Sequence, residues 1–226
     1  MANLHLVTGH AGEPHVKSAD EASLMQAICG YKDVVLDRNS TFSYDIISNN
    51  IVRVNDGEAL MQGRYIKLDK GNYVDLNIDN GHTGYKRIDV IAIEYTRDEE
   101  TNIEEANLVV IKGHETQEEK ANPRWIAEGD TVDGSASINQ MPLYHVKIDG
   151  LSITDVTPVY TIGKDLQTAM SELAYNTRDL AYTLAPAING IYAALKQMPQ
   201  YNDVDADLRD DLERDMYPVV HKYLMG

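Results

Sequence analysis

The hydrophobic period of the chain changes at Gly163, and this change constrains the fold more than any other feature. Before Gly163, short apolar runs alternate with breaks that contain Gly, Asn or Asp, which is typical of β-strands joined by turns. After it, apolar residues recur at intervals of four, three, four, three and four, which places them on one face of a helix. We therefore expect a mainly β N-terminal domain, an antiparallel sandwich or barrel, followed by C-terminal α-helices, α+β overall.

This change divides the chain into three predicted regions. They are an N-terminal arm with a short helix over 1–30, the β domain over 31–162, and a helical oligomerisation region over 163–226.

The short helix is predicted at about 19–29, in "SADEASLMQAICG". Ser18 and Glu21 have the spacing of a capping box, and Gly30 is suited to end the helix. Its apolar face is expected to consist of Leu24, Met25 and Ile28. Cys29 is the only cysteine, which excludes a disulfide within the chain, and we expect it to be a small buried residue.

Turn signals divide the β domain into strands. Asn49-Asn50, Asp56-Gly57 and Lys70-Gly71 are each predicted to break or reverse the chain. The run "YKRIDVIAIEYTRD" is apolar nearly throughout and predicts a central strand buried on both faces, with "EEANLVVIKGHE" as its antiparallel partner. An irregular stretch is expected over 114–140, and a closing hairpin in "PLYHVKIDG" and "LSITDVTPVY".

The helical region has a heptad seam with one polar position. Its residues are Leu166, Met170, Leu173, Thr177, Leu180 and Leu184, and Ile191 continues the apolar stripe. Pro186 is expected to kink or end this helix, and a further helix is predicted within 201–226. The seam either folds back on the β domain or packs on copies of itself, and we favour self-association because it needs no other partner.

The charge of the chain limits its partners. The formal net charge is -16 and the pI is about 4.7, a balance that repels nucleic acids and anionic membranes. No apolar run approaches the roughly 18 residues of a transmembrane helix, and no signal peptide precedes the chain. We expect a protein made in a cytoplasm that neither binds nucleic acid nor inserts into membranes. Tyrosine is abundant, with 14 residues, and this weakly suggests an assembly protein.

Few residues have the pattern of a chemical site. His5, His10 and His15 are evenly spaced, but a period of five fits neither a helix face nor a strand face. We predict no metal, no cofactor and no catalytic residue, hence no enzyme. Arg87 and Asp89 lie two residues apart in the buried strand, share one of its faces, and are predicted to form a structural ion pair.

The sequence leaves open a second function, which is recognition of a carbohydrate or of a host surface. Asn122, Arg124 and Trp125 in the irregular stretch are the candidates for a carbohydrate-binding or host-recognition site. Such a site needs an exposed aromatic ring with polar partners beside it.

Several segments together resemble a known family. In order they are "LVTGHAGEPHVKSADEASLMQAICG", "VRVNDGEALMQGRYIKL", "GYKRIDVIAIEY", "LVVIKG" and "PLYHVKIDGLSITDVTPVY". They are similar to baseplate and tail-tip proteins of tailed phages and prophages of Gram-positive bacteria, of the upper-baseplate or tail-fibre-base type. The similarity covers about residues 1–160 and is carried by Arg87 with Asp89, Val109 to Gly113, Pro142 to Tyr144, and Thr157-Pro158.

The resemblance implies a virion structural subunit rather than an enzyme. It implies a homo-oligomer, a trimer in particular, located in the phage tail baseplate. Other tail proteins would be its partners. The sequence departs from longer members because no large receptor-binding domain follows the helices, so a separate receptor-binding protein is expected to dock on this one.

Overall fold

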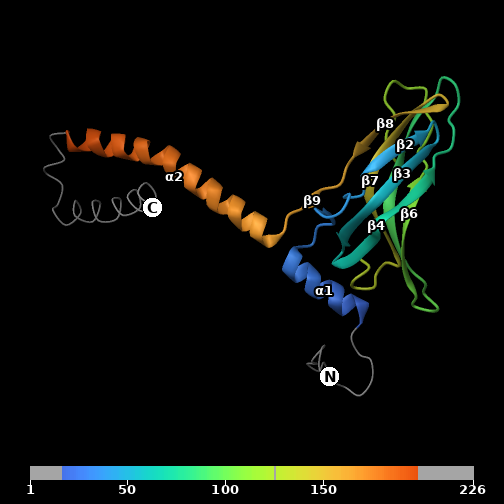
Figure 1. The fold of residues 1–226 in the computed structure, drawn as a ribbon, viewed down its shortest axis with the longest axis horizontal. Coiled ribbons are helices and arrows are strands. Elements are labelled where there is room, and N and C mark those ends of the chain that lie inside the picture. Colours follow the sequence, from blue (N-terminus) through green and yellow to red (C-terminus); the bar gives the residue numbers. More distant parts are fainter. Residues whose placement is uncertain (1–16, 125, 198–226) are drawn as a thin grey trace, which may run out of the picture. The chain divides into compact units, whose positions relative to one another are not determined.

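The computed structural model describes residues 17–124 and 126–197 (Figure 1). The chain divides between Gly163 and Lys164 into two compact units. The first is built mainly of strands, and the described part of the second is a single helix. The three histidines of the arm and the helix predicted within 201–226 lie outside the described residues.

One short helix, nine strands and one long helix form the described chain. In order they are α1 Ser18–Cys29, β1 Val34–Leu36, β2 Tyr44–Ser48, β3 Ile51–Met61, β4 Arg64–Asn77, β5 Lys86–Arg97, β6 Glu104–Ile111, β7 Ile138–Asp149, β8 Ser152–Pro158, β9 Ile162–Gly163 and α2 Leu166–Lys196.

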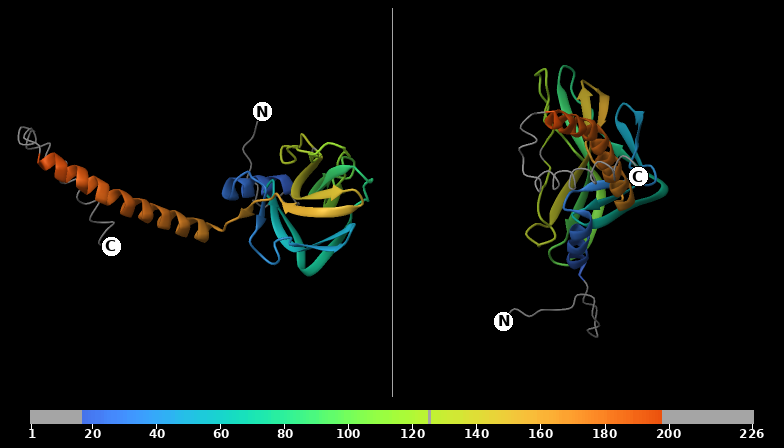
Figure 2. Two further views of the ribbon diagram at one scale, coloured as in Figure 1. Left: turned by 90° about the horizontal axis from the view of Figure 1, so that it is seen from above. Right: turned by 90° about the vertical axis from the view of Figure 1, so that its left-hand side faces the viewer.

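The strands form two sheets that face each other (Figures 1 and 2). In the first sheet β4 pairs with the whole of β3, and β2 and β1 share the opposite edge of β3. The short strand β9 extends this sheet by pairing in parallel with β1. The second sheet has the order β6-β5-β7-β8 and is antiparallel throughout. The predicted sandwich followed by helix is thereby confirmed.

Alternate residues of the strands fill the space between the sheets. Val52 and Val54 of β3 face Ile91 and Ile93 of β5 across the core, and all four are buried. Each such side chain contributes about 1.5–3 kcal/mol on burial. The predicted central strand is confirmed, because β5 is bordered by β6 and β7 and is buried over most of its length. The predicted closing hairpin is also confirmed by β7 and β8.

Tyrosine hydroxyls join the two sheets along the edge where β2 lies near β8. Tyr44 donates to the carbonyl of Val156 at 2.9 Å, and Tyr144 donates to the carbonyl of Phe42 at 2.7 Å. Tyr160, just before β9, donates to the carbonyl of Thr41 at 3.1 Å. Burial raises the pKa of Tyr144 well above its ordinary range, so its hydroxyl stays protonated and able to donate. Part of the abundant tyrosine thus serves the fold itself.

Two of the predicted turns are wrong, and the third is confirmed. β2 and β3 do meet at Asn49-Asn50, but β3 runs straight through Asp56-Gly57 with a bulge. Gly57 is required there by packing, since a Cβ would lie 2.5 Å from the Phe42 nitrogen. The chain reverses instead at Gln62-Gly63, where both residues have positive φ, as a type I′ turn demands. Lys70-Gly71 is likewise a bulge inside β4, not a turn.

The helix α1 has nearly the predicted bounds but not the predicted contacts. Ser18 is its first residue, and Lys17 takes the N-cap position without a side-chain hydrogen bond, so no capping box forms. Of the predicted apolar face, Leu24 and Ile28 are 57% and 70% exposed and only Met25 is half-buried, while Cys29 is exposed. The helix instead packs through Ala22, its one buried residue. The backbone of Ala22 lies so close to Gly63 that position 63 has no room for a side chain.

The helix α2 does not end at Pro186. The whole helix has 31 residues, about 46 Å at 1.5 Å per residue, and it curves along its length (Figure 1). Proline removes one backbone hydrogen bond but leaves the later turns intact.

The glycine of the β3–β4 turn gives a test of the packing of α1. Gly63 and Gly71 both have positive φ, but only Gly63 is crowded, since its Cβ would lie 2.0 Å from the Ala22 carbonyl oxygen. We expect Gly71→Ala to cost about 1 kcal/mol from backbone strain alone. Gly63→Ala should cost about 2 kcal/mol or more, because α1 must also shift. Urea unfolding of both variants measures the difference, and equal losses would contradict the packing of α1 on this turn.

Candidate functional site

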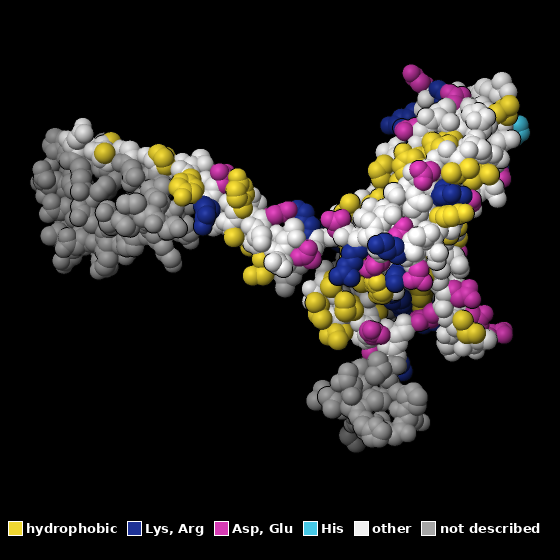
Figure 3. Space-filling view, in the orientation of Figure 1, with side chains coloured by type: hydrophobic (Ala, Val, Ile, Leu, Met, Phe, Trp, Pro, Cys, Tyr) yellow, Lys and Arg dark blue, Asp and Glu magenta, His cyan; other side chains and the backbone are white. Residues whose placement is uncertain are grey.

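The seam of α2 places large apolar side chains on the surface of the described helix. Its large residues are exposed: Met170 62%, Leu173 66%, Leu180 57%, Leu184 47% and Ile191 61%. Thr177 is exposed among them, while the side chain of Leu166 lies outside the described part. Figure 3 shows apolar side chains at intervals along this helix. A surface helix normally buries such a stripe, so this one is suited to a partner.

The positions beside the seam carry no charge. In heptad terms Met170, Thr177, Leu184 and Ile191 are a positions, and Leu173 and Leu180 are d positions. The adjoining e and g positions with described side chains are all uncharged: Gln167, Ala169, Ala174, Asn176 and Thr183. The charged residues with described side chains lie at b and c, in Glu172, Arg178 and Asp179. Burying this face would therefore bring no charge out of water.

The threonines of this face satisfy their hydroxyls within the helix. Thr177 donates to the carbonyl of Leu173 at 2.7 Å, and Thr183 donates to the carbonyl of Asp179 at 2.9 Å. A buried hydroxyl is costly only when it lacks a hydrogen bond. Thr177 can therefore enter an apolar interface without leaving an orphan donor.

The structure brings Arg87 and Asp89 together at the start of β5. The Arg87 Nε lies 2.9 Å from Oδ1 of Asp89, and both side chains are fully buried. The guanidinium also pairs with Glu115 at 3.0 Å and donates to the backbone carbonyls of Asp79 and Asn80. Every side of the buried charge is thus occupied, which is the condition for such a pair to be tolerated.

This ion pair fastens two loops to the sheet. Asp89 accepts from the backbone N–H of Gly113 at 2.8 Å, just after β6. His82, in the loop before β5, binds Glu115 at 2.7 Å. The His82 hydrogen bond and the charge of Arg87 hold the pKa of Glu115 below its ordinary value. All the polar groups at this point are used in the fold, which gives it a structural role.

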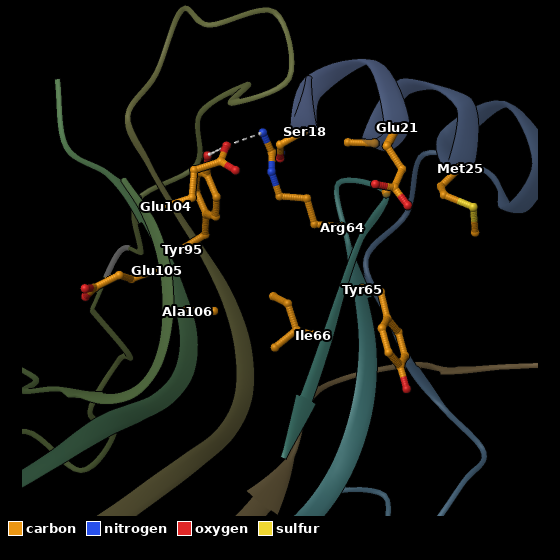
Figure 4. A pocket seen from close by; sticks show the side chains of 12 residues that line it. Ser18, Glu21, Met25, Arg64, Tyr65, Ile66, Tyr95, Glu104, Glu105 and Ala106 are labelled. Atoms are coloured by element: carbon orange, nitrogen blue, oxygen red, sulfur yellow. Dashed lines mark hydrogen bonds and ion pairs between the residues drawn. The ribbon is translucent and has the colours of Figure 1, made fainter. Parts of the chain in front are cut away.

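A cavity of about 530 Å³ lies between α1 and the ends of β4, β5 and β6 (Figure 4). Arg64 dominates it, with its guanidinium over the ring of Tyr95 at 4.4 Å and 3.5 Å from Glu104. It also donates to the Thr131 hydroxyl at 2.8 Å. Burial opposes ionisation of Glu104, but the hydroxyls of Ser18 and Tyr95 and the charge of Arg64 hold its pKa below the ordinary value. The cavity therefore contains a neutralised ion pair.

The residues suggested for carbohydrate binding do not form a defined groove in the described chain. Asn122 and Arg124 are exposed, and Trp125, on which sugar stacking would depend, lies outside the described residues. Arg124 borders a hollow of about 220 Å³ over β5 and β7, beside His145. Burial lowers the pKa of His145, which favours its neutral form. Apart from the imidazole of His145, no aromatic ring lines this hollow among the described residues.

The sequence did not predict the cluster of Arg64, Tyr95 and Glu104. Arg64, Tyr95 and Glu104 come from three strands, and they meet only through the pairing of β5 with β6 and the packing of β4 of the other sheet against them. The alternation of Arg64 with apolar Ile66 on the inward face of β4 was the one available signal.

Among residues 17–124 and 126–197, no group of three or more His, Cys, Asp or Glu side chains is placed to hold a metal ion. Neither described helix combines the length and the apolar character that crossing a membrane requires. No protein-family model matches the chain. No curated protein matches it significantly.

The buried ion pair predicts an unequal response of two arginines. Arg87→Ala would leave Asp89 buried and unpaired, and we expect it to cost about 3–5 kcal/mol. Arg53 binds Asp75 in a half-exposed pair on the outer face of β3 and β4, and Arg53→Ala should cost about 1 kcal/mol or less. Guanidinium chloride unfolding at neutral pH measures both. A small loss in Arg87→Ala would show that the fold does not depend on this pair.

Proposed function

We propose that the chain is a non-catalytic structural subunit that self-associates through α2, and that it belongs to the baseplate or tail tip of a tailed phage. One observation carries the self-association. The a, d, e and g face of α2 is apolar or uncharged over its described side chains, exposed, and free of unsatisfied hydroxyls.

The energetics favour a second copy as the occupant of the seam. Each large apolar side chain that an interface covers contributes about 1.5–3 kcal/mol. A copy of the same helix offers matching a and d residues, so the whole stripe is covered by one symmetric contact. Uncharged e and g positions favour more than two helices, because these positions become partly buried in larger bundles. This supports a trimer.

The phage assignment rests on the ordered segments that resemble baseplate proteins. Two of those segments coincide with parts of the fold that sequence alone singled out: Arg87 with Asp89 on β5, and Val109 to Gly113 at the end of β6. In this proposal the β unit contacts other tail proteins, and α2 gathers the copies. A receptor-binding protein is a further partner, and the location is the virion.

Substitutions at d and b positions of the same helix test the self-association. Leu173→Glu with Leu180→Glu places charges in the seam, and we expect a monomer. The matched control, Ser171→Glu with Arg178→Glu, alters two b positions off the seam and should keep the wild-type oligomer. Size-exclusion chromatography with light scattering gives the mass of each. A wild-type monomer at high concentration, or an unchanged oligomer in the seam variant, would exclude this interface.

Purified virions test the phage assignment. In particles from a strain that produces the protein, quantitative mass spectrometry should detect the chain in the tail fraction, with a copy number per particle that is a multiple of three. A chain present in the cell lysate but absent from intact particles would contradict the virion role while leaving self-association untouched.

A further inference from the structure

Two clusters in the β unit share one composition, an arginine that stacks on a tyrosine and binds an acid. Arg53 lies 3.5 Å over the ring of Tyr73 and donates to both oxygens of Asp75, at 2.7 and 2.9 Å. The second is the cluster of Arg64, Tyr95 and Glu104 in Figure 4. In both, the guanidinium plane meets a ring while its N–H groups meet a carboxylate, a geometry available to arginine but not to lysine.

A third tyrosine and acid lie together without an arginine stacked on the ring. Glu58 of β3 and Tyr65 of β4 are on the outer face of the first sheet, the face that also carries Arg53. Tyr65 pairs with Leu60 and Glu58 with Lys67 in the ladder, so the tyrosine and the acid are diagonal neighbours on this face. The Tyr65 side chain points away from the Arg64 cavity (Figure 4), and the residue is 56% exposed. Its ring is therefore accessible from outside.

The carboxylate of Glu58 is only half satisfied. Its side chain is 9% exposed, and Oε1 accepts from the Asn39 amide at 2.8 Å. Oε2 is buried and has no hydrogen-bond partner among the described residues. The nearest cation, Arg38 Nη1, lies 3.9 Å away on a side chain that is 72% exposed. A buried carboxylate oxygen without a donor is costly, so the site is suited to receive one.

The loop over Glu58 holds the site in this form. Asn39, Thr41 and Phe42 all have positive φ, which non-glycine residues adopt only when their surroundings impose it. Ser40 donates to Asp56 at 2.7 Å, and the Phe42 N–H donates to the Asp56 carbonyl at 3.0 Å. These bonds fix the loop on β3, so the Asn39 amide is already in place on Oε1 before any ligand arrives.

We propose that Glu58 and Tyr65 form a receptor for an arginine side chain of a partner protein, whose guanidinium stacks on Tyr65, displaces the exposed side chain of Arg38 and donates to Oε2 of Glu58. It would complete the third cluster in the way that Arg53 and Arg64 complete the other two. The net charge of -16 favours a basic partner surface. The site lies in the β unit, so it is independent of the self-association of α2.

Titration with a minimal probe tests this receptor. N-acetyl-arginine amide is titrated into the full chain, and ligand-observed NMR gives its dissociation constant. The wild-type protein should bind it, and should bind N-acetyl-lysine amide about tenfold more weakly. Glu58→Gln keeps the bond with Asn39 but removes the charge, and should weaken binding about tenfold or more. Tyr65→Leu should also weaken it.

Two matched variants complete the design. Glu105→Gln makes the same change of charge at an exposed acid of β6 and should leave binding unchanged. Arg38→Ala should leave it unchanged or tighter. Binding that survives Glu58→Gln in a protein with unaltered circular dichroism would overturn the proposal, as would equal binding of the lysine probe or no binding to the wild type. Binding seen only in Arg38→Ala would overturn it too, because Arg38 itself would then be the occupant.

Discussion

The pairing of β5 with β6 and β7 is the constraint on which the rest of the β unit depends. One strand, bordered on both sides, positions several of the polar features described above. Arg87 and Asp89 stand at its start, Val90 underlies the hollow beside Arg124, and Tyr95 near its end forms the floor for Arg64. Its buried middle cannot slip by one residue, since every side chain would then change faces. The register of β5 therefore fixes the loops on both sides of it.

The arginines of this acidic chain differ in how far folding buries them. Arg53 stays half-exposed, so its pair with Asp75 adds little to stability but holds a rigid, flat surface. Arg87 is wholly buried and has to be met on every side. The excess of 36 acidic residues over 20 Lys and Arg residues gives the chain a strongly negative net charge.

Sequence periodicity predicts the sandwich, its central strand, the closing hairpin and the long helix, because burial imposes each of these patterns directly. Such prediction fails where residues typical of a local structure are present because of a tertiary contact instead. Asp56-Gly57 has the composition of a turn, yet Gly57 is there to make room for Phe42. The apolar residues of α1 predict its buried face, yet the helix buries Ala22, where its backbone meets Gly63 of the β3–β4 turn. Of the site residues, the Arg87–Asp89 spacing is readable because both lie on one strand. Glu58 with Tyr65 requires the register of two strands that sequence alone does not provide.

The internal hydrogen bond of Thr177 has a consequence for how copies would be aligned. A buried polar residue often fixes the alignment of a helical bundle because it needs its equivalent on the next chain, as asparagine does. Thr177 needs no hydrogen-bond partner on another chain, because its hydroxyl already donates to the carbonyl of Leu173. The seam therefore favours contact without enforcing one alignment. A shift of one heptad would exchange apolar residues for one another at every position except Thr177, and the hydroxyl of Thr177 would stay bound within its own helix. Alignment must be imposed from outside the seam, by the β units that precede each helix or by what binds them.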